Sequence, residues 1–119
     1  MYRILVIDDD KLIRWSLLQM LTQEGYEVVT VKSSCEAADV LHRNSYNLIF
    51  ADIESVEEHE IDIIDEIRKS QTSAKIVIMS ASSRNQVQSL AEPSLIFSII
   101  EKPFSSEEIK EIARKALRG

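Results

Sequence analysis

Five short apolar runs, each followed by a segment with helical periodicity, are the feature of this sequence that most restricts its fold. Several of these runs are continuous and rich in β-branched residues, such as Ile4–Ile7 and Ile76–Ile78. Strands of this kind are buried on both faces, inside a parallel sheet that helices cover on both sides. The predicted strands are Arg3–Ile7, Glu27–Val31, Leu48–Asp52, Lys75–Ser80 and Ile96–Ile100.

The segments between these runs carry the start and stop signals of helices. Gly25 ends the first helix, which is predicted over residues 11–24. The Ser-x-x-Glu segments Ser33–Glu36 and Ser105–Glu108 are capping boxes that begin the second and fifth helices, and the fourth ends before Pro93. Five strand–helix pairs joined by right-handed crossovers predict a (βα)5 chain of the α/β class. Its doubly wound parallel five-stranded sheet would have the flavodoxin-like strand order 2-1-3-4-5.

Composition and charge exclude several classes of function. The chain has 119 residues, 45% of them hydrophobic, which predicts a single domain over residues 1–119. No apolar run approaches the roughly 20 residues of a membrane span, and no signal-peptide pattern is expected. The net charge of −6 argues against direct binding of nucleic acid or an anionic membrane by this domain. The single cysteine, Cys35, cannot form an internal disulfide, which fits a cytoplasmic location.

Polar residues stand at the predicted carboxyl ends of four strands. These are Asp8–Asp10, Asp52, Ser80 and Lys102. In the order 2-1-3-4-5 these strands are neighbours, so carboxylates, a hydroxyl and an ammonium meet at the ligand-binding edge of the sheet. Clustered carboxylates suit a hard cation such as Mg²⁺, and a carboxylate with positive charge beside it can accept a phosphoryl group. The sequence therefore predicts a phosphoryl-accepting site at Asp52 with Mg²⁺ bound beside it.

Each of these residues has a purely structural explanation when it is taken singly. Asp52 can be a turn residue, Ser80 a helix cap and Lys102 a solvated lysine. Asp10 is expected to cap the first helix, which leaves Asp8–Asp9 for the metal. Asp8-x-Asp10 with the later Ser80 and Lys102 is also similar to the first motifs of haloacid-dehalogenase-type phosphatases. That class needs a further acidic pair at a later strand end, which the pattern does not supply, and it gives Asp52 no role.

Over essentially its whole length, the sequence resembles the receiver domains of bacterial two-component response regulators. The matching segments are ILVIDDD at 4–10, LIFADI at 48–53, IVIMSAS at 76–82 and IIEKPF at 99–104. The resemblance implies that Asp52 is the phosphoacceptor, that Ser80 bonds the phosphoryl group and that Lys102 pairs with it. It also implies a cis bond between Lys102 and Pro103. The implied Mg²⁺ ligands are Asp8, Asp9, Asp52 and the backbone carbonyl of Glu54.

The same resemblance implies two signalling partners, one that donates the phosphoryl group and one that responds to it. A sensor histidine kinase would supply the phosphoryl group, and a conformational change would control an output domain or a separate effector protein. Such a domain is a switch and not an enzyme, although it promotes its own phosphorylation and dephosphorylation. Ile13–Leu17 also resembles the first helix of receivers attached to enhancer-binding transcription activators. Receivers often dimerise through the face between the fourth and fifth helices, and the mixed charges predicted there permit a homodimer.

Several positions depart from the pattern of this family. The loop after the acceptor has Ser55, Val56 and Glu60 where Met-Pro and a Gly are usual. Ile99 stands three residues before the lysine, where the family usually has a Tyr or Phe that turns inward as the hydroxyl moves. These departures leave a second hypothesis open. In that hypothesis the chain is a pseudo-receiver, an interaction module that keeps the fold without being phosphorylated.

Overall fold

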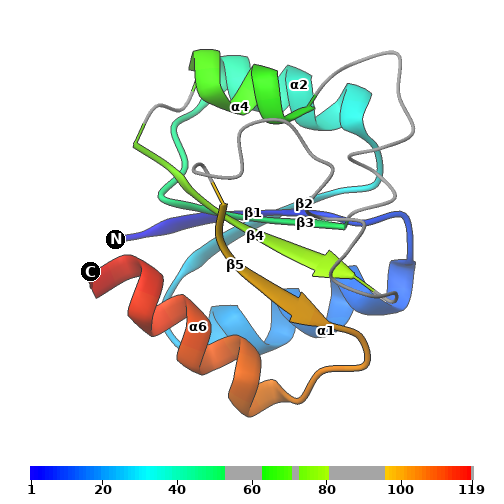
Figure 1. The fold of residues 1–119 in the computed structure, drawn as a ribbon, viewed down its shortest axis with the longest axis vertical. Coiled ribbons are helices and arrows are strands. Elements are labelled where there is room, and N and C mark those ends of the chain that lie inside the picture. Colours follow the sequence, from blue (N-terminus) through cyan, green and yellow to red (C-terminus); the bar gives the residue numbers. More distant parts are fainter. Residues whose placement is uncertain (53–62, 71–72, 81–95, 119) are drawn as a thin grey trace.

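The computed structural model of the chain describes residues 1–52, 63–70, 73–80 and 96–118 (Figure 1). Five strands form one parallel sheet in the order β2-β1-β3-β4-β5, which confirms the predicted fold class and strand order. The observed bounds match the predicted ones, except that the last strand ends one residue later. The strands are β1 (Arg3–Ile7), β2 (Glu27–Val31), β3 (Leu48–Asp52), β4 (Lys75–Ser80) and β5 (Ile96–Glu101).

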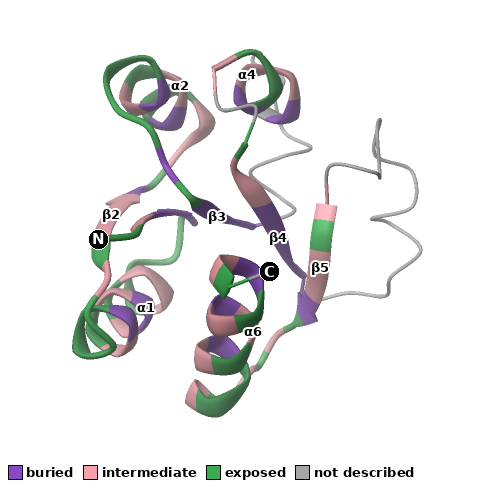
Figure 2. Ribbon diagram, turned by 90° about the vertical axis from the view of Figure 1, so that its left-hand side faces the viewer, coloured by how far each residue is buried: buried purple, intermediate pink, exposed green. Residues whose placement is uncertain are grey.

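Helices cover both faces of the sheet (Figures 1 and 2). One face carries α1 (Lys11–Gln23) and α6 (Ser106–Arg118), and the other carries α2 (Ser34–Arg43) and α4 (Ile63–Ser70). The helix predicted before Pro93 lies outside the described residues. Within the described ranges, no helix combines the length and the apolar character that crossing a membrane requires.

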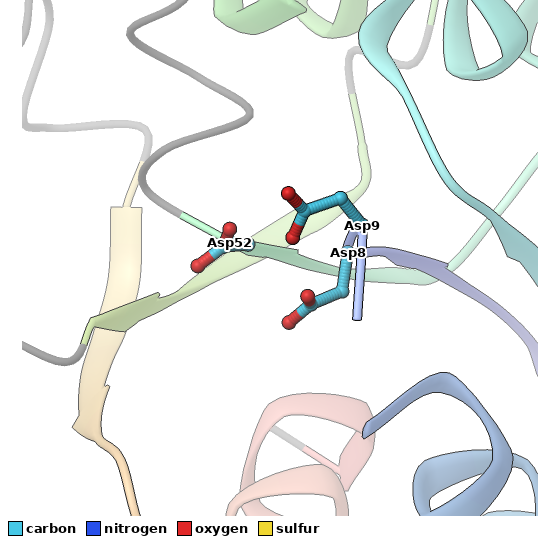
Figure 3. Close-up of side chains that lie close together, drawn as sticks. All are labelled: Asp8, Asp9 and Asp52. Carbon is cyan, nitrogen blue, oxygen red and sulfur yellow. The ribbon is translucent and has the colours of Figure 1, made fainter. Parts of the chain in front are cut away.

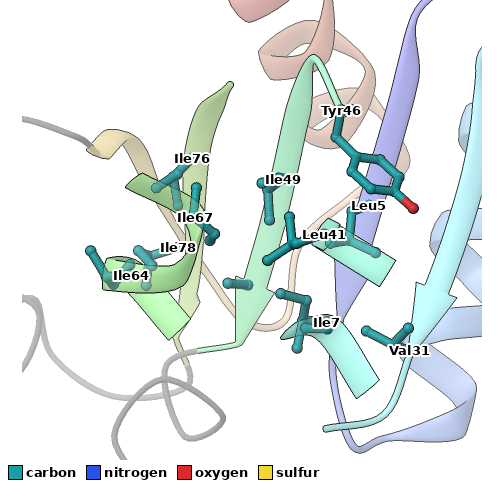
Figure 4. Close-up of a cluster of buried hydrophobic side chains, with 12 residues drawn as sticks. Leu5, Ile7, Val31, Leu41, Tyr46, Ile49, Ile64, Ile67, Ile76 and Ile78 are labelled. Carbon is teal, nitrogen blue, oxygen red and sulfur yellow. The ribbon is translucent and has the colours of Figure 1, made fainter. Parts of the chain in front are cut away.

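The sheet divides the buried side chains into two cores, one beneath each helix layer. In β1, Leu5 and Ile7 face α2 and α4, whereas Ile4 and Val6 face α1 and α6. Because both faces are covered, the central strands are apolar on both sides between their end residues, which explains their continuous sequence runs. Figure 4 shows the core beneath α2 and α4, which includes Leu5, Ile7, Val31, Leu41, Tyr46, Ile49, Ile64, Ile67, Ile76 and Ile78.

Both ends of α1 are fixed by short-range hydrogen bonds, and its N-terminus lies next to the acidic residues that follow β1. Asp10 is the N-cap, and its carboxylate accepts from the Leu12 N–H at 2.9 Å, as predicted. At the other end Gly25 has a positive φ of 93°. Its N–H donates to the Thr22 carbonyl at 3.0 Å, and the Tyr26 N–H donates to the Leu21 carbonyl at 3.2 Å, which is the Schellman pattern of a glycine-terminated helix. The N-cap places the first turn of α1 directly after the acidic end of β1.

The predicted capping box of α6 is present and gives a test of local stability. The Glu108 N–H donates to Ser105 Oγ at 3.2 Å, and the Ser105 N–H donates to Glu108 Oε1 at 3.1 Å. Ser105→Ala removes the serine oxygen, and we expect a loss of about 1 kcal/mol in the free energy of unfolding. The matched control is Ser106→Ala, which changes the same residue type one position beyond the cap. Urea unfolding of both variants is the measurement, and equal losses would contradict the capping role.

Candidate functional site

The carboxyl ends of four neighbouring strands bring the predicted site residues to one edge of the sheet. Asp52 is the last residue of β3, and Asp8 directly follows β1. The parallel register pairs Ile7 with Ala51 and Asp52 with Met79, so these ends are level with one another. Ser80 ends β4, and Lys102 directly follows β5. The fold thus places these four residues at the edge where parallel sheets bind their ligands.

Three carboxylates form a cluster at this edge, as Figure 3 shows. Asp8, Asp9 and Asp52 each offer one oxygen, and the three oxygens lie within 4.8 Å of one another. Asp8 is 0% exposed and Asp52 is 3% exposed, whereas Asp9 is exposed to solvent. Charges this close repel strongly when water is excluded, so the cluster needs positive charge beside it.

Lys102 supplies positive charge to the two buried carboxylates. Its Nζ donates to Asp8 Oδ2 at 2.9 Å and to Asp52 Oδ1 at 3.0 Å. Burial alone would lower the pKa of Lys102, but the hydrogen bonds and the charges of the two carboxylates outweigh it and raise the pKa above its usual value. The ammonium therefore stays charged at neutral pH. The peptide bond between Lys102 and Pro103 is cis, as the sequence resemblance implied.

Asp8 is held by hydrogen bonds on its main chain and its side chain. Its N–H donates to the Val31 carbonyl at 3.1 Å, and its Oδ1 accepts from the Asp10 N–H at 2.9 Å. Its carbonyl accepts from Arg14 Nη1 at 2.7 Å. Arg14 was not among the predicted site residues, because a single arginine in the first turns of a helix is not distinctive in sequence. The structure nevertheless brings its guanidinium to the loop that carries the acidic cluster.

The remaining predicted residues occupy different places around this cluster. Ser80 is 0% exposed, and its carbonyl accepts from the Lys102 N–H at 2.8 Å, which joins the ends of β4 and β5. The carboxylate of Asp10 caps the N-terminus of α1 and is not one of the three clustered carboxylates. A phosphatase of the haloacid-dehalogenase type would need that carboxylate in its site, so this arrangement disfavours it. Glu54 lies outside the described residues.

Ile99, the unusual residue of β5, is half-buried and packs against the core beneath α2 and α4. It is paired in register with Ile78 of β4, next to the strand end that carries Ser80. An aliphatic side chain here contributes to packing. It lacks the aromatic ring that a Tyr or Phe would have at this position.

The residues of the acidic cluster fit a small divalent cation. All three groups are hard oxygen donors, and such donors are the ligands that Mg²⁺ prefers. The exposed Asp9 leaves the cluster open to solvent on one side, so that an ion can enter and keep part of its water shell. The buried Asp8 and Asp52 give the opposite side of the cluster a fixed position.

A doubly wound sheet with an acidic cluster, a buried serine and a paired lysine at its carboxyl edge defines a receiver-type signalling domain. The family of response regulator receiver domains matches residues 4–114, and the chain belongs to this family. Its members act in two-component phosphorelay signalling.

Several curated relatives are transcriptional regulators that are longer than this chain. The chain is 31% identical over 116 residues to the DNA-binding transcriptional regulator NtrC of Azospirillum brasilense, covering 98% of this chain and 24% of that protein. It is 31% identical over 108 residues to the transcriptional regulatory protein PdtaR of Mycobacterium tuberculosis, covering 90% of this chain and 52% of that protein. The chain thus spans about a quarter of NtrC and about half of PdtaR.

Solved structures of receiver domains share the fold. The response regulator TrrA of Thermotoga maritima, solved in complex with Mg²⁺ and BeF, is 34% identical with a TM-score of 0.82, and the alignment covers 98% of this chain and all of that one. NtrX of Brucella abortus is 28% identical with a TM-score of 0.86, covering 99% of this chain and 27% of that one. A receiver domain of Methanospirillum hungatei has a TM-score of 0.89 at 23% identity, a likeness that concerns the fold alone.

Proposed function

We propose that this domain accepts a phosphoryl group on Asp52 from a sensor histidine kinase, with Mg²⁺ bound beside the acceptor, and so controls an output partner. The observation that carries the proposal is the environment of the Asp52 carboxylate. This group is buried, it belongs to a cluster of three carboxylates, and it accepts a hydrogen bond from Lys102 Nζ at 3.0 Å. An acceptor, a set of metal ligands and a fixed cation are the parts that phosphoryl transfer to a carboxylate requires.

The proposed reaction is a transfer from phosphohistidine to aspartate. An oxygen of the Asp52 carboxylate forms a bond to phosphorus while the phosphorus–nitrogen bond of the donor breaks. The bonding electron pair stays with the imidazole nitrogen, which then takes a proton from solvent. The Lys102 ammonium, already fixed beside Asp52, offsets the negative charge of the phosphoryl oxygens.

The metal would be held by Asp8, Asp9 and Asp52, together with the carbonyl of Glu54 if the family's ligand set applies. When bound, Mg²⁺ supplies positive charge that neutralises the cluster and the incoming phosphoryl group. The domain itself is proposed to be a switch that promotes its own phosphorylation and dephosphorylation, and not an enzyme that turns over a separate substrate.

The conformational response would begin at Ser80. Its carbonyl accepts from the Lys102 N–H at 2.8 Å, so the two residues lie side by side at the sheet edge that carries Asp52. The phosphoryl group can shift the domain only by interacting differently with its two states. With Ile99 at the position of the usual aromatic residue, the shift would be transmitted by repacking of an aliphatic side chain.

We also propose partners and a location for the domain. An output domain or a separate effector would read the switch, as the greater length of NtrC and PdtaR suggests. A cytoplasmic location is part of the proposal, and the free, exposed Cys35 suits a reducing compartment. We also propose that the domain can form a homodimer through the face between the predicted fourth and fifth helices, of which the fourth lies outside the described residues. Arg114 of α6 pairs with Glu24 of α1 at 3.2 Å and so faces the other helix of its layer.

Intact mass after incubation with a small-molecule phosphodonor tests the central proposal. We expect one phosphoryl group per chain in the wild type with Mg²⁺, little without Mg²⁺, and none in Asp52→Asn. The matched control is Asp39→Asn, which changes an exposed aspartate of α2 that is ion-paired with Arg43. This control should label like the wild type. No adduct in the wild type, under conditions that label another receiver, would favour the pseudo-receiver hypothesis.

A further inference from the structure

We propose that Arg14 is a positioning residue for the metal site, because its guanidinium fixes the peptide unit that joins Asp8 to Asp9. Arg14 Nη1 donates to the Asp8 carbonyl at 2.7 Å, which is a short and charge-assisted hydrogen bond. This inference rests on the proposed function, since it concerns how the chain holds the carboxylates that would bind Mg²⁺.

The bond acts on the part of the cluster that burial does not hold. Asp8 is 0% exposed, and its N–H and both carboxylate oxygens take part in hydrogen bonds. Asp9 is exposed, so packing does not set the direction of its side chain. A peptide unit is planar, so holding the Asp8 carbonyl oxygen also holds the nitrogen of Asp9. The Asp9 carboxylate then starts from a backbone of fixed orientation.

The position of Arg14 in α1 explains why its side chain reaches this loop. The Arg14 N–H donates to the Asp10 carbonyl at 3.1 Å, so Arg14 lies one turn into the helix that Asp10 caps. Side chains in a helix point back toward its N-terminus. For Arg14 that direction leads to the end of β1, where its guanidinium bonds the Asp8 carbonyl.

A positioning role and a simple charge effect predict opposite changes in Mg²⁺ affinity when Arg14 is replaced. A guanidinium near a cation site repels the cation, so its removal should tighten Mg²⁺ binding if charge alone matters. If Arg14 instead orients the ligand loop, its removal should weaken binding despite the lost repulsion. Residues that orient metal ligands typically contribute roughly 10- to 100-fold in metal affinity.

The test compares Arg14→Met with Arg43→Met, an identical substitution at an exposed arginine of α2 that pairs with Asp39 at 2.8 Å. Thermal unfolding is followed against Mg²⁺ concentration, and the dissociation constant is taken from the shift of the midpoint. We expect at least a roughly tenfold higher dissociation constant in Arg14→Met, and the wild-type value in Arg43→Met. Unchanged or tighter binding in Arg14→Met would overturn the inference.

A second measurement, without metal, separates positioning from general destabilisation. Amide exchange of Asp10 reports on the loop, because its N–H donates to Asp8 Oδ1. We expect faster exchange there in Arg14→Met while the amides of the β3 core keep their wild-type rates. Uniformly faster exchange would overturn the inference in favour of a merely structural role. If the wild type itself shows no Mg²⁺-dependent shift of the unfolding midpoint, the proposed metal site is wrong. The inference about Arg14, which depends on that site, is then wrong as well.

Discussion

Replacing Lys102 with Met is expected to destabilise the metal-free domain by about 3 kcal/mol. The ammonium bridges Asp8 Oδ2 and Asp52 Oδ1, and both carboxylates are almost completely buried. Methionine has a similar length and keeps the apolar contacts of the lysine stem. The loss therefore comes from leaving two neighbouring buried charges without their cation, which costs far more than an exposed ion pair contributes.

The matched control is Lys69→Met, because Lys69 also pairs with an aspartate, at 3.0 Å from Asp65 Oδ2. The Lys69 side chain is 64% exposed whereas that of Lys102 is 16% exposed, so the control should lose much less stability than Lys102→Met because solvent screens its ion pair. The free energy of unfolding is measured in urea with a metal chelator present. Equal losses in the two variants would mean that Lys102 is an ordinary surface lysine.

Magnesium is expected to restore much of the stability that Lys102→Met loses. In the variant, the cation would be the counter-charge for carboxylates that the lysine neutralises in the wild type. The Mg²⁺-dependent gain in unfolding free energy should thus be larger in the variant than in the wild type. Labelling by a small-molecule phosphodonor should still be slower, on the order of 100-fold at saturating Mg²⁺, because the fixed donor beside the acceptor is missing.

The strands could be predicted from their continuous apolar runs, and their order followed from right-handed crossovers in a doubly wound sheet. Ile4–Ile7 and Ile76–Ile78 lie between two helix layers, so every position in them is apolar. The predicted end of β5 was one residue too early, because Glu101 is exposed and charged and yet pairs in register with Ser80. Backbone hydrogen bonding decides the end of a strand, and side-chain polarity does not report it.

Helix caps were predictable as patterns and less so as contacts. The box at Ser105 has both reciprocal hydrogen bonds. At the start of α2, Ser33 Oγ accepts from the Glu36 N–H as expected, but the carboxylate of Glu36 accepts from the Lys32 N–H at 2.9 Å. At this helix the Glu carboxylate of the motif therefore bonds the N–H of the residue before the N-cap and not that of the N-cap itself.

The residues that form the site could be predicted from the sequence, but the hydrogen bonds between them could not. Strand ends place Asp8, Asp52 and Lys102 at one edge, and topology alone gives that result. A sequence does not show that one ammonium bridges both carboxylates, or that Arg14 reaches a backbone carbonyl. Such contacts depend on the direction and distance of each side chain in the folded chain, and the sequence does not show which arginine or lysine makes them.

Magnesium should raise the melting temperature of the wild-type domain by about 10 °C when its concentration is about 100-fold above the dissociation constant. At that concentration a single site on the folded state contributes about 2.7 kcal/mol. Only the folded chain holds Asp52 beside Asp8 and Asp9, so the ion binds the native state more tightly than the unfolded one. An equal ionic strength of potassium chloride is the first control, because screening of the surface charge is not specific to a divalent ion.

The Asp52→Asn variant is expected to show a much smaller shift in Mg²⁺. It removes one of the three charged ligands and about half of the charge in the buried part of the cluster, while Lys102 keeps its contact with Asp8 at 2.9 Å. The metal-free variant should therefore stay folded, which makes its metal response interpretable. Asp39→Asn, at an exposed aspartate of α2, should retain the full wild-type shift. A full shift in Asp52→Asn would show that the ion binds elsewhere, and the proposed ligand set would then be wrong.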